Sequence, residues 1–63
     1  MRPEIKAFKE FGKTQKALSA SEIENRTGMN YNTVVNVLDS LQEVGAIQKI
    51  ETSGYSYYKA SSD

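Results

Sequence analysis

The sequence contains no cysteine and no histidine. Disulfides, thiolate chemistry and zinc fingers are therefore excluded, as is the most common general base of enzymes. No run of about 18 apolar residues is present, so no segment is expected to cross a membrane. Residues 1–5 lack the apolar core of a secretory signal peptide. We therefore expect a cytoplasmic protein.

The chain has 63 residues, which we interpret as one domain over residues 1–63. So short a chain has little room for a catalytic pocket. It also contains no glycine-rich phosphate loop, no Ser-His-Asp set and no cluster of metal ligands. These observations predict a protein that is not an enzyme and that needs no cofactor.

Charge is balanced overall but unevenly distributed, with 8 basic and 8 acidic residues. Residues 1–16 carry a net +3, whereas residues 17–48 carry a net −3. A freestanding nucleic-acid binder usually shows a basic excess, so the neutral total is evidence against that function. The separation of a basic first segment from an acidic middle is more informative than the total.

Three segments have the pattern of helices. The first covers about residues 3–12: Pro3 suits the first helical position, and Gly12 is expected to end the helix. Its expected apolar face consists of Ile5, Ala7, Phe8 and Phe11. The second covers about residues 20–27, because residues 19–22 fit a capping box and Gly28 suits a helix exit.

The third helix is expected over about residues 31–44, with Asn30 as its N-cap and Gly45 after its end. Its apolar stripe consists of Val34, Val37, Leu38, Leu41 and Val44. We expect this stripe to pack against Ile23 and Phe8.

After Gly45 the hydrophobic period changes from helical to extended, which predicts a hairpin over about residues 46–59. The two strands are expected at 46–50 and 55–59, with a turn at 51–54. A lone hairpin is marginal in water, so this one must pack on the helices. Ile47, Ile50 and one face of the tyrosine-rich second strand are the expected contacts.

The order of these elements, and the run LSASEIENRTGMNYNTVVNVLDSLQEVGAI at residues 18–47, resemble the winged helix-turn-helix family. Similar runs occur in MarR-like and ArsR-like transcriptional regulators of prokaryotes or mobile elements. The matching features are Ser21-Glu22-Ile23, Thr27-Gly28-Met29, Thr33-Val34, Leu38, Leu41 and Gly45. The resemblance implies a mainly α (α+β) fold of three helices and a C-terminal wing. It also implies that the third helix enters the major groove of double-stranded DNA.

On the third helix, Asn32 and Asn36 lie opposite the apolar stripe and one turn apart. Asparagine can bond adenine N6 and N7 together, so these two residues are expected to read bases. Tyr31 and Thr33 flank them at the helix start, where hydroxyls suit phosphate oxygens. The other interpretation is that these polar residues only solvate an exposed face.

No lysine or arginine lies between Thr27 and Gln48, although DNA-binding winged helices usually have one on this helix. Phosphate contacts must therefore come from elsewhere, and the expected contributors are Arg26, Lys49, Lys59 and Lys16. We expect Arg26 and the two wing lysines to border the face formed by Asn32 and Asn36. Asp39 and Glu43 are expected to point away from that face.

A protein-docking module without strong DNA affinity is the alternative function. Four tyrosines are many for this size, and tyrosine is common at protein interfaces. Two of the wing tyrosines have a simpler role in closing the core. If the partner is a second copy of the chain, the first helix, through Phe8 and Phe11, or the tyrosine-rich wing is the expected interface.

Overall fold

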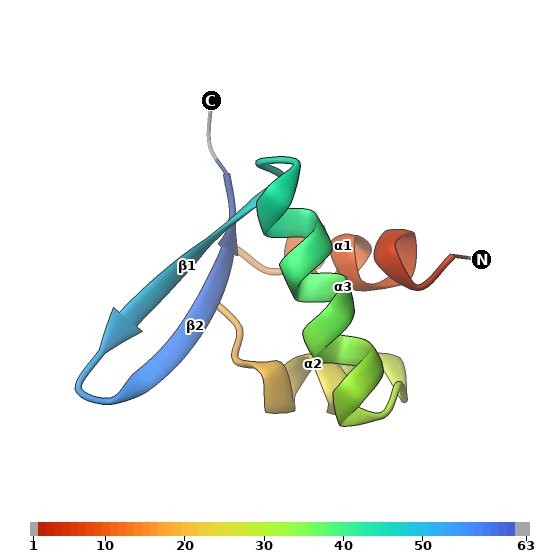
Figure 1. The fold of residues 1–63 in the computed structure, drawn as a ribbon, viewed down its shortest axis with the longest axis horizontal. Coiled ribbons are helices and arrows are strands. Elements are labelled where there is room, and N and C mark those ends of the chain that lie inside the picture. Colours follow the sequence, from red (N-terminus) through yellow and green to blue (C-terminus); the bar gives the residue numbers. More distant parts are fainter. Residues whose placement is uncertain (1, 62–63) are drawn as a thin grey trace.

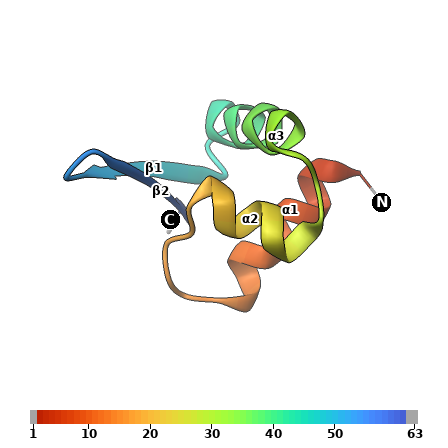
Figure 2. The same ribbon diagram turned by 90° about the horizontal axis from the view of Figure 1, so that it is seen from below.

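The computed structural model describes residues 2–61 and contains three helices followed by a two-stranded antiparallel hairpin (Figure 1). The elements in chain order are α1 (Pro3–Lys13), α2 (Ala20–Thr27), α3 (Tyr31–Glu43), β1 (Ile47–Thr52) and β2 (Tyr55–Ala60). The three helices pack against one another, and the hairpin extends to one side of them (Figure 2). The predicted winged helix-turn-helix architecture is confirmed.

Side-chain caps start α2 and α3, as predicted, and a glycine ends α2. The Ser19 hydroxyl accepts a hydrogen bond from the Glu22 N–H at 3.3 Å, and the Glu22 carboxylate accepts one from the Ser19 N–H at 3.0 Å. Gly28 ends α2 at φ +77°, a left-handed conformation that glycine adopts without steric cost. The Asn30 side chain then accepts from the Thr33 N–H at 2.9 Å and starts α3.

The expected role of Gly12 was wrong. Gly12 lies inside α1, which continues to Lys13 and leaves the helix through Thr14 in an extended conformation. A glycine stop needs a left-handed residue after the helix, and Gly12 does not have a positive φ. Gly12 is exposed, and a Cβ placed there would meet no atom within 4 Å.

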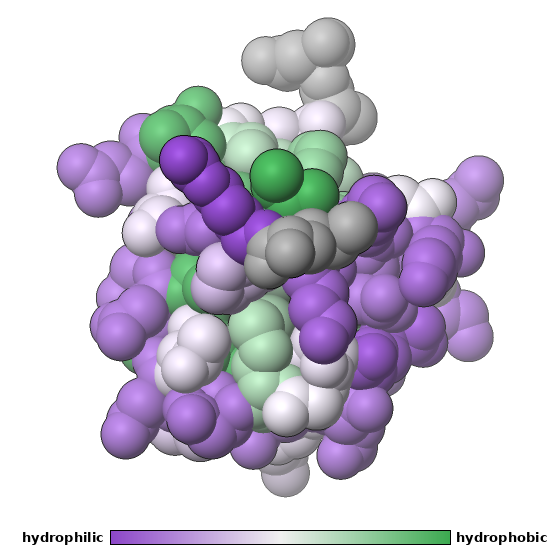
Figure 3. All heavy atoms as spheres, turned by 90° about the vertical axis from the view of Figure 1, so that its right-hand side faces the viewer, coloured by the Kyte–Doolittle hydropathy of each residue, from purple (hydrophilic) through white to green (hydrophobic). Residues whose placement is uncertain are grey.

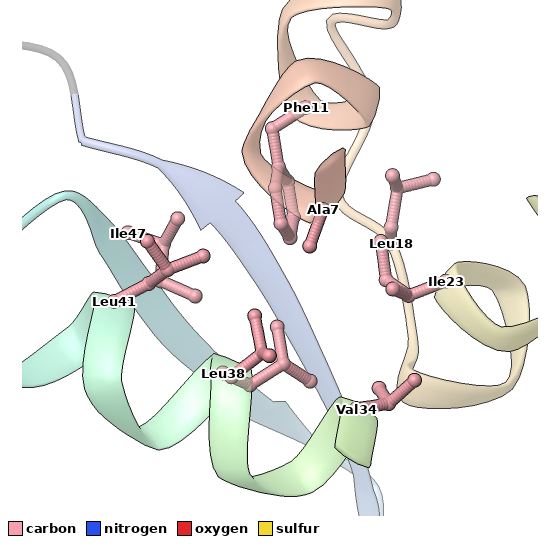
Figure 4. Packing of buried hydrophobic residues seen from close by; sticks show 9 residues of the cluster. Ala7, Phe11, Leu18, Ile23, Val34, Leu38, Leu41 and Ile47 are labelled. Carbon is pink, nitrogen blue, oxygen red and sulfur yellow. The ribbon is translucent and has the colours of Figure 1, made fainter. Parts of the chain in front are cut away.

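The hydrophobic core joins all three helices, the connection before α2 and the start of β1 (Figure 4). Its buried members are Ala7, Phe11, Leu18, Ile23, Val34, Val37, Leu38, Leu41 and Ile47. Burial of Val34, Val37, Leu38 and Leu41 confirms four of the five residues of the predicted stripe of α3. The prediction was wrong for Val44, which is 77% exposed because α3 ends at Glu43 and Val44 is the residue that leaves the helix. Met29 and Tyr58 pack against this core from the side.

The expected apolar face of α1 was wrong in part. Ile5 and Phe8 are 49% and 42% exposed, whereas Ala7 and Phe11 are buried. Ala7 and Phe11 are one turn apart, and Phe8 is rotated about 100° from Ala7, which turns it out of the core. Phe8 is therefore not the anchor of α3 that the sequence suggested. Figure 3 shows hydrophobic side chains gathered among hydrophilic ones on the face at the N-terminal end of the molecule.

The hairpin has a two-residue turn, Ser53 and Gly54, with φ of +48° and +84°. Positive φ at both positions matches the twist of paired strands, so the ladder runs up to the pair Thr52–Tyr55. β1 is thus longer at the turn than predicted, whereas β2 begins at Tyr55 as predicted. Ile50, expected in the core, is 37% exposed because residues three apart on a strand point to opposite faces.

Leu18 adds a single-residue bridge to the other edge of β2. Its N–H donates to the Tyr58 carbonyl at 2.8 Å, and the Tyr58 N–H donates to the Leu18 carbonyl at 2.7 Å. β2 therefore lies between Leu18 and β1, and the hairpin is fixed to the connection that precedes α2.

Candidate nucleic-acid interface

The outer face of α3 is polar. Asn32, Asn36, Asp39 and Glu43 are all exposed, whereas Val34, Val37, Leu38 and Leu41 on the other side are buried. The exposed four are spaced four, three and four residues apart, so they share one stripe along the helix. We call these four residues the polar stripe of α3.

The expectation that Asp39 and Glu43 point away from Asn32 and Asn36 was wrong. α3 is a continuous helix over Tyr31–Glu43, so all four side chains project in nearly the same direction. Asp39 follows Asn36 by only about 4.5 Å along the axis, at about 1.5 Å per residue. Any ligand lying along this stripe meets amides at one end and carboxylates at the other.

At the start of α3 the two expected flanking residues differ in accessibility. Tyr31 is 57% exposed, whereas Thr33 is half-buried. The Thr33 N–H already donates to the Asn30 side chain, so it is not available to a phosphate. Tyr31 is the more accessible of the two hydroxyl donors.

Arg26 is turned toward α1. Its guanidinium lies 3.8 Å from the Glu10 carboxylate, which also pairs with the Lys13 ammonium at 3.2 Å. Glu10 is only 8% exposed, and a buried carboxylate is tolerated where cations and hydrogen bonds compensate it. Glu10 was not recognised from the sequence, since only the Lys13 partner three residues away is visible locally.

The two wing lysines lie on opposite faces of the hairpin. Lys49 is paired with Tyr58, and Lys59 is paired with Gln48, so their side chains alternate across the sheet. They therefore cannot both border the polar stripe from the same face of the wing.

Lys59 instead shares a cavity with Lys16, near the end of α1. Both line a cavity of about 310 Å³ whose other lining residues are Phe11, Gly12, Thr14, Gln15 and Ala60. Four expected phosphate contacts are thus spread over three places: Arg26 beside α1, Lys49 on one wing face, and Lys16 with Lys59 around this cavity.

Two searches of residues 2–61, for clustered metal-ligand side chains and for long apolar helices, gave no candidate. No group of three or more acidic, histidine or cysteine side chains is arranged to hold a metal ion there. No helix in the same range is long and apolar enough to cross a membrane.

The fold places this chain in the class of winged helix-turn-helix domains. The solved structure of the ferric uptake regulator from Francisella tularensis, determined with iron, matches it with a TM-score of 0.83 at 21% sequence identity. The match covers 95% of this chain and 51% of that one, so the chain spans about half the length of that regulator. At this identity the likeness shows the shared fold.

The family is shown by a sequence model. The model described as "Sugar-specific transcriptional regulator TrmB" matches residues 3–62. The chain belongs to the TrmB family of transcriptional regulators, which lies within the winged-helix class predicted from the sequence. A comparison with curated proteins finds no match.

Proposed function

We propose that this chain binds double-stranded DNA in a sequence-dependent way and regulates transcription, with α3 in the major groove. One observation carries the proposal: Asn32 and Asn36 are exposed one turn apart on a helix whose opposite side is fixed in the core. A rigid helix with two asparagines on its outer face has the geometry for bidentate contacts to adenine. Membership in a family of transcriptional regulators supports the same role.

The remaining roles follow from accessibility. Tyr31, exposed at the start of α3, supports the asparagines by contacting the DNA backbone, and Thr33 contributes from its half-buried position. Arg26, Lys16, Lys49 and Lys59 are the proposed phosphate contacts. A protein with this function acts inside the cell, where its DNA target is located.

The proposal implies that the electrostatic attraction between this chain and DNA is weak. The net charge is zero, α3 has no basic residue, and its polar stripe ends in two carboxylates. Each phosphate contact contributes about 0.9 to the slope of log affinity against log salt. We therefore expect a shallow salt dependence and a larger share of the binding free energy from base contacts than in a basic winged helix.

The test is a binding titration against a pool of mixed duplex DNA at two salt concentrations, followed by sequencing of the bound fraction. Asn36→Ala should relax the preference at one base position by about 1–3 kcal/mol. Asn25→Ala is the matched control, since Asn25 is also exposed but lies on α2. Unchanged affinity and preference in the double variant Asn32→Ala, Asn36→Ala would exclude α3 as the reader.

A protein-docking module is the second candidate, favoured by the exposure of Tyr31 and Tyr55, at 57% and 67%. Tyrosine supplies rigid amphipathic contact area at interfaces. If the chain shows no salt-dependent DNA binding near physiological ionic strength, this function replaces the first, with Tyr31 and the wing tyrosines as the contact surface.

A further inference from the structure

The outer edge of β1 is an unpaired strand edge. β2 is paired on both sides, with β1 and with Leu18, whereas within residues 2–61 β1 is paired only with β2. Five of the six residues of β1 are exposed, and the strand contains no proline. Figure 1 shows the hairpin extending away from the helices, which leaves this edge open. Such edges are templates for pairing with another strand.

The hydrogen bonds show which backbone groups point outward along this edge. Tyr58 directs its N–H and carbonyl to Leu18, away from β1. In an antiparallel ladder the residue opposite it, Lys49, must then turn its own N–H and carbonyl away from β2. The same alternation applies to Glu51, opposite Ser56. Lys49 and Glu51 therefore present the free donors and acceptors of the edge.

We propose that the edge of β1 pairs antiparallel with β1 of a second copy, with Ile50 opposite Ile50 at the two-fold axis. In this register Lys49 of each copy lies opposite Glu51 of the other. Both residues present outward backbone groups, so each of these two pairs forms a complete hydrogen-bonded pair. The side chains of the two residues point to the same face, which makes two cross-strand ion pairs.

Charge selects this register over its neighbours. Sliding the second strand by two residues in one direction places Lys49 opposite Lys49, and sliding it by two residues the other way places Glu51 opposite Glu51. Like charges directly opposite each other are destabilising in a sheet. The arrangement is self-complementary, as a two-fold interface must be.

The other face of the paired strands buries apolar surface. Ile50, 37% exposed in one copy, is opposite Tyr57 in its own hairpin. In the proposed dimer the row across four strands is Tyr57, Ile50, Ile50 and Tyr57. The N–H and carbonyl of Ile50 point toward β2 of its own hairpin and not toward the second copy. The two isoleucines therefore form a non-hydrogen-bonded pair, in which the two Cα atoms lie closer together than in a hydrogen-bonded pair. An edge this short buries little area, so the dimer is expected to be weak and concentration-dependent.

Charge-reversal variants test the pairing directly, by sedimentation or native mass spectrometry of the protein without DNA. Lys49→Glu and Glu51→Lys each place like charges opposite each other, so each alone should weaken the dimer about tenfold or more. An equimolar mixture of the two variants should form a heterodimer. In that mixture positions 49 and 51 are both acidic in one copy and both basic in the other, so opposite charges meet only between unlike copies.

A matched control separates the register from general attraction between oppositely charged proteins. Lys9→Glu and Glu4→Lys give the same two net charges, but both residues lie on α1 and not on the edge of β1. Each should dimerise as the parent does, and mixing them should give no preference for the heterodimer. Thermal unfolding of each variant by circular dichroism establishes that it is folded.

Three results would overturn the proposal. The first is a parent protein that stays monomeric up to millimolar concentration. The second is a dimer that persists unchanged through both single reversals, which would place the interface elsewhere, for example at the exposed Ile5 and Phe8 of α1. The third is a mixture of the edge variants that forms no more heterodimer than the control mixture. None of these outcomes depends on whether α3 binds DNA.

Discussion

Gly12 and Gly28 are both exposed and have space for a methyl group, but their backbone conformations differ. This difference determines whether alanine at each position raises or lowers the free energy of unfolding. A Cβ at either position meets no atom within 4 Å. Gly12 is inside α1 without a positive φ, whereas Gly28 is at φ +77° after α2. Only the second conformation is one that other residues avoid.

Substitution by alanine should therefore have opposite signs at these two sites. Gly12→Ala should raise the free energy of unfolding by about 0.5–1 kcal/mol, because glycine in a helix interior is entropically costly. Gly28→Ala should lower it by about 1–2 kcal/mol through left-handed backbone strain. Urea unfolding measures both, and the same sign for the two variants would contradict the helical assignment of Gly12.

The side chain of Leu38 lies at the centre of the core and is only 1% exposed. Leu38→Ala removes buried methyl groups and leaves a cavity, which should cost about 2–5 kcal/mol. Stability of so small a domain is itself only a few kcal/mol, so the variant should be largely unfolded by circular dichroism. A native-like spectrum with cooperative melting near the parental temperature would show that α3 is not anchored here. Ile5→Ala, at an exposed site, is the control.

Among the elements, α3 carries the feature most directly open to test. Asp39 and Glu43 share the polar stripe with the two asparagines. If this stripe lies in the major groove, their carboxylates repel the phosphates that line it. The double variant Asp39→Asn, Glu43→Gln should therefore bind DNA about tenfold more tightly at low salt, with less gain at high salt.

The control for this variant is Glu4→Gln, which removes one negative charge from the first turn of α1. An equal gain per charge in the control would mean that only the net charge matters. No gain in either variant would place the C-terminal half of α3 away from the duplex.

Local signals made α2 and the start of α3 predictable. The hydroxyl and carboxylate of a capping box are three residues apart, and the Asn30 cap also acts over three residues, so both can be recognised in the sequence. The alternation of side chains along a strand could also be read from the sequence. Ile47 and Ile50 are three residues apart and therefore point to opposite faces, so the expectation that both face the core was inconsistent with that alternation.

Contacts between different helices and strands could not be predicted from local sequence patterns. Periodicity assigned Phe8 to the core and gave no reason to bury Glu10, but the structure turns Glu10 inward, where Arg26 of α2 reaches it. The partner is 16 residues away in the chain, and no local pattern marks it. For the candidate site, the asparagines were found from their position on the helix, whereas the positions of Lys49 and Lys59 depend on the hairpin register, which only the structure gives.

For the whole molecule, the bridge between Leu18 and Tyr58 connects two parts of the chain that are far apart in sequence, which affects how the domain folds. The two residues are 40 positions apart, so this pair can form only after a long loop has closed, at an entropic cost that grows with loop length. Contacts of high sequence separation slow folding and bind distant parts into one cooperative transition. The N–H of Leu18 should then exchange with solvent only through global unfolding. Removal of the wing should unfold the three helices and not leave a smaller folded domain that still binds DNA.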